Sequence, residues 1–334
     1  MTATGARSPA RPEPDLTARF AEALGRLWPD GGRLGLAVSG GPDSLAMMLL
    51  AEAVIPGQFE VATVDHGLRA ESAQECARVT ELCARRGIDC SILAVTVPGG
   101  NLQAKARAAR YAALADWASE RGLTAVATAH HADDQAETLL MRLNRGSGLS
   151  GLTAVRESRF LPGIAISLIR PLLTFRRDEL AAVVAAAGLE PVLDPSNLDE
   201  RFDRARIRRA LAELEWIDPV ALSRSASLLG EAQHAIEATA DEEWARGVVA
   251  EDDGFNYYPS CPSTYIETEV VTAIIARMGG TASRAEVARA IERLANGRTA
   301  SLAGVLARPN TEQREGDAAV VKWSFTPEPP RRLH

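Results

Sequence analysis

The chain has 334 residues, of which 46% are hydrophobic and 24% are charged, and its formal net charge at pH 7 is −7. This length allows two or three domains with a sizeable core, and the composition is ordinary for a soluble globular protein. The sequence has no run of eighteen apolar residues, which excludes a membrane-spanning helix, and its net negative charge argues weakly against a nucleic-acid partner.

The first predicted segment is a disordered lead over residues 1–18. Three prolines stand among small and charged residues within Met1–Asp15, and the apolar core of a secretion signal is missing. The four cysteines of the chain form no CxxC pair. We therefore expect free or buried thiols and a reducing, cytoplasmic location.

Short apolar strands alternate with helices in the first half of the chain. The strands are predicted at 33–38, 59–64, 90–97, 123–128 and 164–169, and the helices at 43–54, 71–86, 102–121 and 132–143. This alternation is typical of an α/β fold with a doubly wound, parallel five-stranded sheet that helices cover on both faces. Right-handed crossovers place the carboxyl ends of all the strands at one edge, where such sheets bind ligands.

The second half of the chain is predicted to be mainly helical. Helices are expected at 178–187, from about 203, and at 219–244, 264–277 and 284–294, and the strands 300–307 and 318–323 alternate well enough for a C-terminal hairpin. We expect an α/β domain over residues 19–212 and a smaller, mainly helical domain over residues 213–334.

The turn after the first predicted strand has the sequence Ser39-Gly-Gly-Pro-Asp-Ser44. A buried strand ends here, two glycines free the backbone, and a helix begins near Asp43. Several backbone N–H groups and the positive end of the helix dipole then point at one place, which predicts a phosphate site. The turn is not a Walker loop, because no Gly-Lys-Ser/Thr closes it and no lysine lies near.

A second candidate site follows the fourth strand, where His130 and His131 precede Asp133, Asp134 and Glu137. Asp134 and Glu137 are three residues apart and share a helix face. Two carboxylates near a phosphate loop can hold Mg²⁺, or equally an incoming cationic amine. The alternative is that an aspartate only caps the helix. The two histidines are either packing residues or part of the site.

Two further candidates lie at the same predicted edge of the sheet. Asp43 is either a helix cap or a Mg²⁺ ligand, and we favour the ligand because a carboxylate beside bound phosphates is repulsive unless a metal intervenes. Asp65 and His66 come at the carboxyl end of the second strand.

Arginines supply almost all of the basic side chains near these positions. Arg107 and Arg110 share one face of the helix 102–121, and a dense cluster follows at Arg201, Arg204, Arg206, Arg208 and Arg209. One interpretation is solvated helix faces. The other is that Arg107 and Arg110 neutralise developing phosphate charge, and that Arg204 and Arg208, four residues apart, form a stripe suited to phosphates.

Taken together, these motifs resemble the tRNA(Ile)-lysidine synthetase family, within the PP-loop ATP pyrophosphatases. The motifs that carry the resemblance are Ser39–Ser44, Val64-Asp-His-Gly-Leu-Arg69, Asn101–Tyr111, His130–Thr138, Arg145-Gly-Ser-Gly-Leu-Ser-Gly-Leu152, Arg170-Pro-Leu-Leu173 and Asp194-Pro-Ser-Asn197. The resemblance extends from about residue 33 to residue 210.

The resemblance implies a ligase that forms a carbon–nitrogen bond. ATP and Mg²⁺ adenylate the C2 oxygen of the wobble cytidine of an isoleucine tRNA with a CAU anticodon, and the ε-amine of free lysine then displaces AMP. The catalytic domain would be residues 19–212, and residues 213–334 would bind tRNA. No membrane partner is implied, and a homodimer is left open.

The resemblance also implies roles for individual residues. The ATP and Mg²⁺ contacts would come from Ser39, Gly40, Gly41, Pro42, Asp43 and Ser44, with Asp65 and His66 near the adenine and ribose. The catalytic residues would be Asp43, Asp134, Glu137 and Arg110, the metal ligands Asp43 and Asp134, and the substrate contacts Arg107, His131, Arg204, Arg206 and Arg208.

The chain departs from the family pattern at two positions. Gln103 stands where a glutamate is common, and Ala205 interrupts an arginine–asparagine pair. The alternative functions are a PP-loop tRNA thiolase, a small-molecule amidating synthetase, and a nucleotide-binding module without turnover. A thiolase usually needs reactive or cluster-binding cysteines, an amidating synthetase would leave the arginine clusters idle, and a binding module would not need Asp134 with Glu137.

Overall fold

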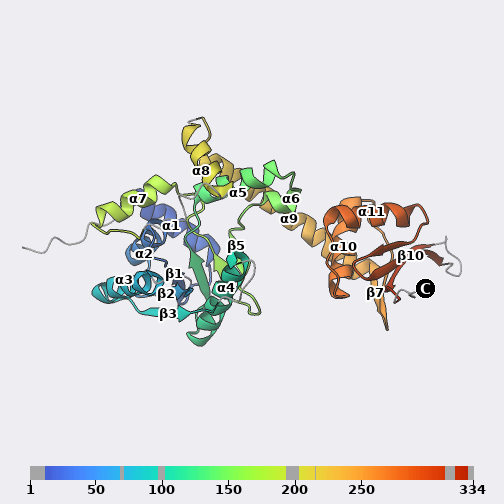
Figure 1. The fold of residues 1–334 in the computed structure, drawn as a ribbon, viewed down its shortest axis with the longest axis horizontal. Helices are drawn as coiled ribbons and strands as arrows, with labels where there is room; N and C mark the ends of the chain where they lie inside the picture. Colours follow the sequence, from blue (N-terminus) through green and yellow to red (C-terminus); the bar gives the residue numbers. More distant parts are fainter. Residues whose placement is uncertain are drawn as a thin grey trace, which may run out of the picture. The chain divides into compact units, whose positions relative to one another are not determined.

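The computed structural model describes residues 12–67, 71–96, 102–192, 203–214, 216–312 and 320–329 (Figure 1). The chain forms two compact units, Met1–Gly230 and Glu231–His334, and the division falls within the long helix α9 (Pro219–Gly247). In the part of the chain that is described, no helix is both long and apolar enough to cross a membrane.

A six-stranded sheet forms the centre of the first unit, with the strand order β3-β2-β1-β4-β6-β5. Its strands are β1 (Leu34–Ala37), β2 (Phe59–Asp65), β3 (Cys90–Ala94), β4 (Ala125–Thr128), β5 (Ser158–Phe160) and β6 (Ser167–Ile169). All the neighbours are parallel except β5 and β6. The order reverses between β1 and β4, so the crevice that binds ligands in such sheets is expected beyond the carboxyl ends of these two strands.

Helices cover both faces of this sheet, because alternate residues of each strand point to opposite sides. On one face, α1 (Pro14–Leu27), α2 (Pro42–Val54), α3 (Glu71–Arg86) and α7 (Arg177–Ala186) share a core with Leu34 and Leu36. On the other face, α4 (Leu102–Glu120) packs Leu114 and Trp117 against Ala37 and neighbouring strands. The predicted doubly wound α/β fold is confirmed.

The sheet differs from the prediction in having a sixth strand. β5 is fully exposed and pairs antiparallel with β6, with Arg159 opposite Leu168. An exposed three-residue edge strand has no buried alternation, so the sequence pattern offers no signal for it. The predicted strand 164–169 is shorter in the structure, where it is β6.

The N-terminal helix α1 also differs from the prediction. It begins at Pro14, inside the stretch 1–18 that was expected to be disordered, and residues 1–11 lie outside the described part of the chain. Pro14 stands in the first turn, where its missing N–H is not needed, and Leu16, Phe20 and Leu24 are buried. The apolar residues recur at helical spacing, so the proline-rich composition was misleading.

The second unit contains more strand than predicted. Its elements are the end of α9, β7 (Val248–Glu251), β8 (Gly254–Tyr257), α10 (Thr264–Arg277), α11 (Arg284–Ala295), β9 (Ala300–Leu302), β10 (Val305–Glu312) and β11 (Val320–Pro327). The strands form an antiparallel sheet in the order β7-β8-β11-β10-β9. The predicted strand 300–307 covers β9, the turn after it and the start of β10, and the predicted strand 318–323 overlaps β11. The helices of this unit were predicted, but only part of the five-stranded sheet that packs with them around Tyr257, Trp323 and Phe325 was.

Candidate functional site

The turn between β1 and α2 is shaped as a phosphate site. Gly41 is the N-cap of α2, no side chain caps the helix, and Pro42 occupies its first turn. The first N–H groups of a helix have no acceptor within it, and they carry the positive end of the dipole. The structure thus places Ser39–Ser44 at an uncapped helix N-terminus, which favours an anion.

Gly40 allows the backbone to make this turn. Its φ is +83°, and an added Cβ would lie 3.2 Å from Val79 Cγ2 and 3.3 Å from Val192 Cγ2. Any other residue would therefore be strained and crowded at once. The carbonyl of Gly40 accepts a hydrogen bond of 2.9 Å from the N–H of Val192, which ties the turn to the segment after α7.

Two serine hydroxyls hold the turn from inside. The Ser39 N–H donates to Ser44 Oγ at 3.1 Å, and Ser44 Oγ donates to the Gly41 carbonyl at 3.0 Å. The two hydroxyl oxygens are 3.2 Å apart. Ser44 is therefore a residue that shapes the phosphate turn as well as a candidate ligand.

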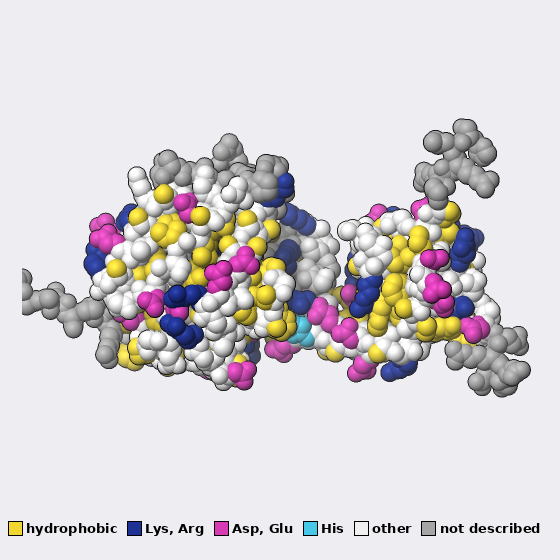
Figure 2. Space-filling view, turned by 90° about the horizontal axis from the view of Figure 1, so that it is seen from below, with side chains coloured by type: hydrophobic (Ala, Val, Ile, Leu, Met, Phe, Trp, Pro, Cys, Tyr) yellow, Lys and Arg dark blue, Asp and Glu magenta, His cyan; other side chains and the backbone are white. Residues whose placement is uncertain are grey.

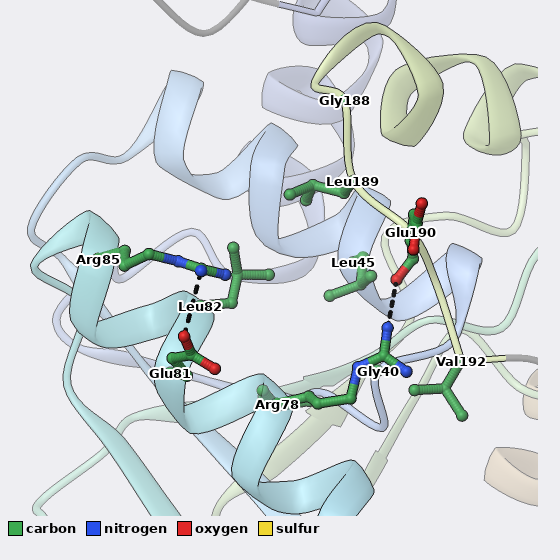
Figure 3. A pocket seen from close by; sticks show the side chains of 11 residues that line it. Gly40, Leu45, Arg78, Glu81, Leu82, Arg85, Gly188, Leu189, Glu190 and Val192 are labelled. Carbon is green, nitrogen blue, oxygen red and sulfur yellow. Dashed lines mark hydrogen bonds and ion pairs between the residues drawn. The ribbon is translucent and has the colours of Figure 1, made fainter.

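A cavity of about 210 Å³ lies behind this turn (Figure 3). Of the site residues predicted from the sequence, only Gly40 lines it. Three of its charged side chains have local partners, because Arg78 donates to the Glu190 carbonyl at 3.2 Å and Arg85 pairs with Glu81 at 3.2 Å. The cavity separates α3 from the 188–192 segment and does not contain the predicted catalytic groups.

His131 links the phosphate turn to the second candidate site. It is the N-cap of α5 (Ala132–Asn144), and its side chain is 1% exposed. Nε2 lies 3.5 Å from Asp43 Oδ2 and 3.5 Å from Asp134 Oδ2, while Nδ1 lies 3.4 Å from Asp133 Oδ2. One buried ring thus joins three carboxylates from two helices that follow neighbouring strands.

The three carboxylates control the charge of this ring. Burial alone would lower the pKa of His131, but the nearby carboxylates of Asp133, Asp43 and Asp134 outweigh it and raise the pKa to about 10. At neutral pH the ring is an imidazolium. It therefore offsets part of the negative charge beside the phosphate turn and is not available as a general base.

Glu137 forms a second charged centre one helix turn further on. Its side chain is 1% exposed and accepts hydrogen bonds from Arg177 Nη2 at 2.9 Å, Arg204 Nε at 2.7 Å and Arg208 Nε at 2.7 Å. Burial raises the pKa of Glu137, but the arginine contacts dominate and lower the pKa to about 2. Arg204 and Arg208 lie on α8 (Asp203–Glu213), so Glu137 connects α5 with α8.

The two predicted aspartates of α5 also have structural roles. Asp134 Oδ2 accepts the His131 N–H at 3.3 Å and completes a capping box, while Asp134 Oδ1 pairs with Arg204 Nη2 at 2.5 Å. Asp133 accepts the backbone N–H of Arg177 at 2.9 Å. The pKa of Asp133 is about 2, because His131 and Arg177 outweigh the effect of burial.

Asp65 and His66 lie at the end of β2, as predicted. Asp65 Oδ1 accepts Ser72 Oγ at 2.6 Å and the Gly67 N–H at 2.9 Å, and both bonds lower its pKa. His66 has a lowered pKa because of burial and the nearby charge of Arg110. Asp65 thus has a turn-forming role besides any ribose contact.

The structure brings most of the predicted residues into one continuous network. The phosphate turn reaches Asp43, His131, Asp134 and Arg204 through successive contacts, and Glu137 joins Arg204 to Arg208. Arg206 lies on α8 with an exposed side chain. The motif Asp194–Asn197 and Arg201 lie outside the described residues.

The sequence prediction missed Arg177. This residue follows β6 and begins α7, forty positions after its partner Glu137, so no local spacing connects the two. The cysteines are free, as predicted; Cys76 and Cys83 are buried between α3 and the sheet. In the described ranges no group of three or more His, Cys, Asp or Glu side chains is arranged to hold a metal by itself.

Comparisons with known proteins agree with this arrangement. The PP-loop domain family matches residues 12–215. A tRNA(Ile)-lysidine synthase of Novosphingobium aromaticivorans is 48% identical over 305 residues, 90% of each chain, and one of Zymomonas mobilis is 38% identical over 310 residues, 91% of each chain.

A solved structure supports the fold alone. The U34-tRNA thiolase NcsA from Methanococcus maripaludis, with its [4Fe-4S] cluster, matches with a TM-score of 0.52 at 18% identity. The match covers 64% of this chain and 79% of that one.

Proposed function

The chain belongs to the tRNA(Ile)-lysidine synthase family of PP-loop proteins, and from this premise we propose that it joins lysine to the wobble cytidine of an isoleucine tRNA with a CAU anticodon. The observation that carries the proposal is the uncapped N-terminus of α2 with Asp43 beside it, in a chain that is 48% identical to a curated lysidine synthase over 90% of both lengths.

The reaction has two steps. The C2 oxygen of the cytidine attacks the α-phosphorus of ATP, the α–β phosphoanhydride bond breaks, and pyrophosphate leaves. The lysine ε-nitrogen then attacks C2, the C2–oxygen bond breaks, and AMP leaves with that oxygen. Adenylation is needed because an unactivated cytosine oxygen is a poor leaving group. The N–H groups at the start of α2 bind the phosphates, and their dipole favours the charge that develops on pyrophosphate.

Asp43 is the residue that fits Mg²⁺. Its Oδ1 is buried and has no hydrogen-bond partner among the described residues, while Oδ2 faces His131 at 3.5 Å. Mg²⁺ binds through one or two carboxylates plus phosphate oxygens, so Asp43 beside the phosphate turn suits it. The ion would neutralise phosphate charge. Asp134 as a second ligand stays a prediction, because its oxygens already contact Arg204 and His131.

The lysine end of the site involves Asp134, Glu137 and the arginines of α8. Three guanidinium groups already neutralise Glu137, whereas Asp134 has one arginine and the His131 ring. Asp134 is therefore the more available partner for an incoming ammonium. A carboxylate with a pKa of about 2 is a weak base, so Glu137 binds and orients and does not remove the ammonium proton.

The test is a transfer assay with the purified full-length chain. Labelled lysine, ATP, Mg²⁺ and an isoleucine tRNA transcript with a CAU anticodon are expected to give labelled RNA, with one AMP and one pyrophosphate per lysine. Asp43→Asn should abolish the label while the fold is kept. The matched control is Glu81→Gln, because Glu81 is exposed and pairs with Arg85; this variant should remain active.

Two outcomes would reject the proposal. One is a wild-type chain that binds ATP but transfers no lysine to the transcript. The other is label on a CAU-anticodon methionine tRNA equal to that on the isoleucine tRNA, since an enzyme of this kind must discriminate the two.

A further inference from the structure

A cluster of arginines surrounds Tyr111 on the α4 side of the sheet. The Cζ atoms of Arg159, Arg107 and Arg110 lie 4.4, 5.1 and 6.0 Å from the centre of the Tyr111 ring. Arg170, directly after β6, is only 2% exposed, and burial lowers its pKa while the Tyr111 hydroxyl opposes that effect. Four cations from α4, β5 and the end of β6 thus share one buried ring.

These charges have no carboxylate counterpart in the described part of the chain. Arg170 Nη1 donates to the Arg156 carbonyl, but its Nε is buried and has no hydrogen-bond partner there. Glu137, in the same unit, is by contrast a buried charge that is paired with three arginines. Burying an unpaired guanidinium is costly, so the cluster is built for an anion that binds from outside.

His130 adds to the electrostatics of the cluster. It follows β4, its Nδ1 is 3.1 Å from Thr128 Oγ1, and burial together with the charges of Arg170, Arg110 and Arg107 keeps its pKa well below the usual value. The neutral ring therefore adds no further positive charge beside the arginines. Because His130 follows β4 and Arg170 follows β6, the cluster lies at the same carboxyl edge of the sheet as the phosphate turn, next to the strand-order switch.

We propose that Arg107, Arg159 and Arg170, arranged around Tyr111, form a second phosphoryl-binding site, distinct from the phosphate turn. The planar guanidinium fork matches phosphoryl oxygens in a bidentate way. Arg107 and Arg159 are exposed, so the site opens to solvent, and the phosphates of ATP already have the N-terminus of α2. The occupant that fits is a phosphodiester of the RNA backbone near the reacting cytidine.

This inference rests on the proposed function for the identity of the RNA. The test measures the affinity of the full-length chain for the CAU transcript at several KCl concentrations, and separately its affinity for ATP. The variants are Arg107→Gln, Arg159→Gln and Arg170→Gln, with Arg170→Lys as the charge-conserving variant. Arg85→Gln is the control, since Arg85 is exposed and pairs with Glu81 on α3.

We expect Arg107→Gln and Arg159→Gln each to reduce the slope of log K against log [KCl] by about 0.7–0.9, which corresponds to one lost phosphate contact. The ATP affinity should stay within about twofold. Compared with Arg170→Gln, Arg170→Lys should restore the salt slope of transcript binding but not the full wild-type affinity, because an ammonium lacks the bidentate fork. If ATP affinity falls and the slope does not, the site exists but its phosphoryl group belongs to ATP.

The inference is overturned if neither the slope nor the ATP affinity moves in the two exposed variants. Arg107 and Arg159 are exposed, so their variants keep the test valid even if Arg170→Gln fails to fold. A wild-type chain that transfers no lysine would reject the proposed function, but the ATP and salt measurements would still report on this site.

Discussion

Glu137 shows how a single buried carboxylate organises the candidate site. Three arginines from α7 and α8 donate to its two oxygens, and its side chain is 1% exposed. The residue therefore determines where Arg204 and Arg208 point. Because Glu137 acts through the arginines that it positions, a substitution that removes only its charge is more informative than a truncation of its side chain.

The substitution Glu137→Gln keeps the shape of the side chain and removes its charge. We expect the free energy of unfolding to fall by about 1–3 kcal/mol, because three partly exposed guanidinium groups lose their charged acceptor but remain accessible to water. Lysine transfer should be lost as well. Urea unfolding and hydrogen exchange of α8 measure the two structural effects, and exchange in α8 should accelerate more than in α3.

The matched control for this substitution is Glu81→Gln. Glu81 is exposed and pairs with Arg85 at 3.2 Å, so its loss should cost less than about 0.5 kcal/mol. A comparable loss of stability in the two variants would contradict the role given to Glu137.

At the scale of elements, the parallel strands were predictable, whereas the antiparallel edge strands β5 and β7 were not. β1, β2 and β4 are buried apolar runs followed by glycine or polar turns, which is a strong local signal. β5 and β7 are largely exposed, with polar and apolar residues mixed, and they become strands only because a neighbour offers its free backbone groups. Tertiary pairing of this kind leaves no periodic pattern.

In the candidate site, the residues that are close in sequence were predictable, and the contacts between distant segments were not. The phosphate turn and the pair Asp134 and Glu137 follow from local spacing, as does the stripe of Arg204 and Arg208. The contact of His131 with Asp43 joins helices that begin ninety positions apart, and Arg177 reaches Glu137 across forty. Such pairings depend on strand order, which the sequence pattern alone did not specify.

The connection between β8 and α10 predicts a pH dependence in the second unit. Glu243 on α9 is 2% exposed and accepts hydrogen bonds from Tyr257 Oη at 3.0 Å, from the Ser260 N–H at 2.7 Å and from Ser260 Oγ at 2.6 Å. Burial raises the pKa of Glu243, but these bonds outweigh it and lower the pKa below the unfolded value of 4.5.

A lowered folded-state pKa means that Glu243 contributes its full stability above about pH 4.5 and loses it as the pH falls through the folded value. Hydrogen exchange of β8 and α10, corrected for its intrinsic pH dependence, should therefore show a stability difference between wild type and Glu243→Gln. That difference should be largest near pH 6 and shrink toward pH 3. A difference that stays constant over this range would show that the carboxylate is not preferentially ionised in the folded unit.

At the scale of the whole molecule, charge is divided unevenly between the two units. Residues 231–334 contain 16 acidic side chains and 11 Lys or Arg, whereas residues 1–230 contain 28 and 26. Acidic and basic side chains lie interspersed on the face of each unit drawn in Figure 2. The net charge of −7 therefore hides a first unit that is nearly neutral and in which arginines gather near the site.

The electrostatic part of RNA binding should accordingly come from the first unit. The double substitution Arg206→Gln and Arg209→Gln on α8 is expected to reduce the salt slope of transcript binding by about 1–2, since each lost phosphate contact removes about 0.7–0.9. Arg289→Gln with Arg298→Gln, two exposed arginines of the acidic second unit, removes the same charge and should leave the slope unchanged. Filter binding between 50 and 300 mM KCl, about the range in which such contacts dominate, measures both. Equal slope changes in the two double variants would contradict this prediction, because both units would then contact RNA phosphates. The local density of arginines, and not the net charge of a unit, would in that case govern where the RNA lies.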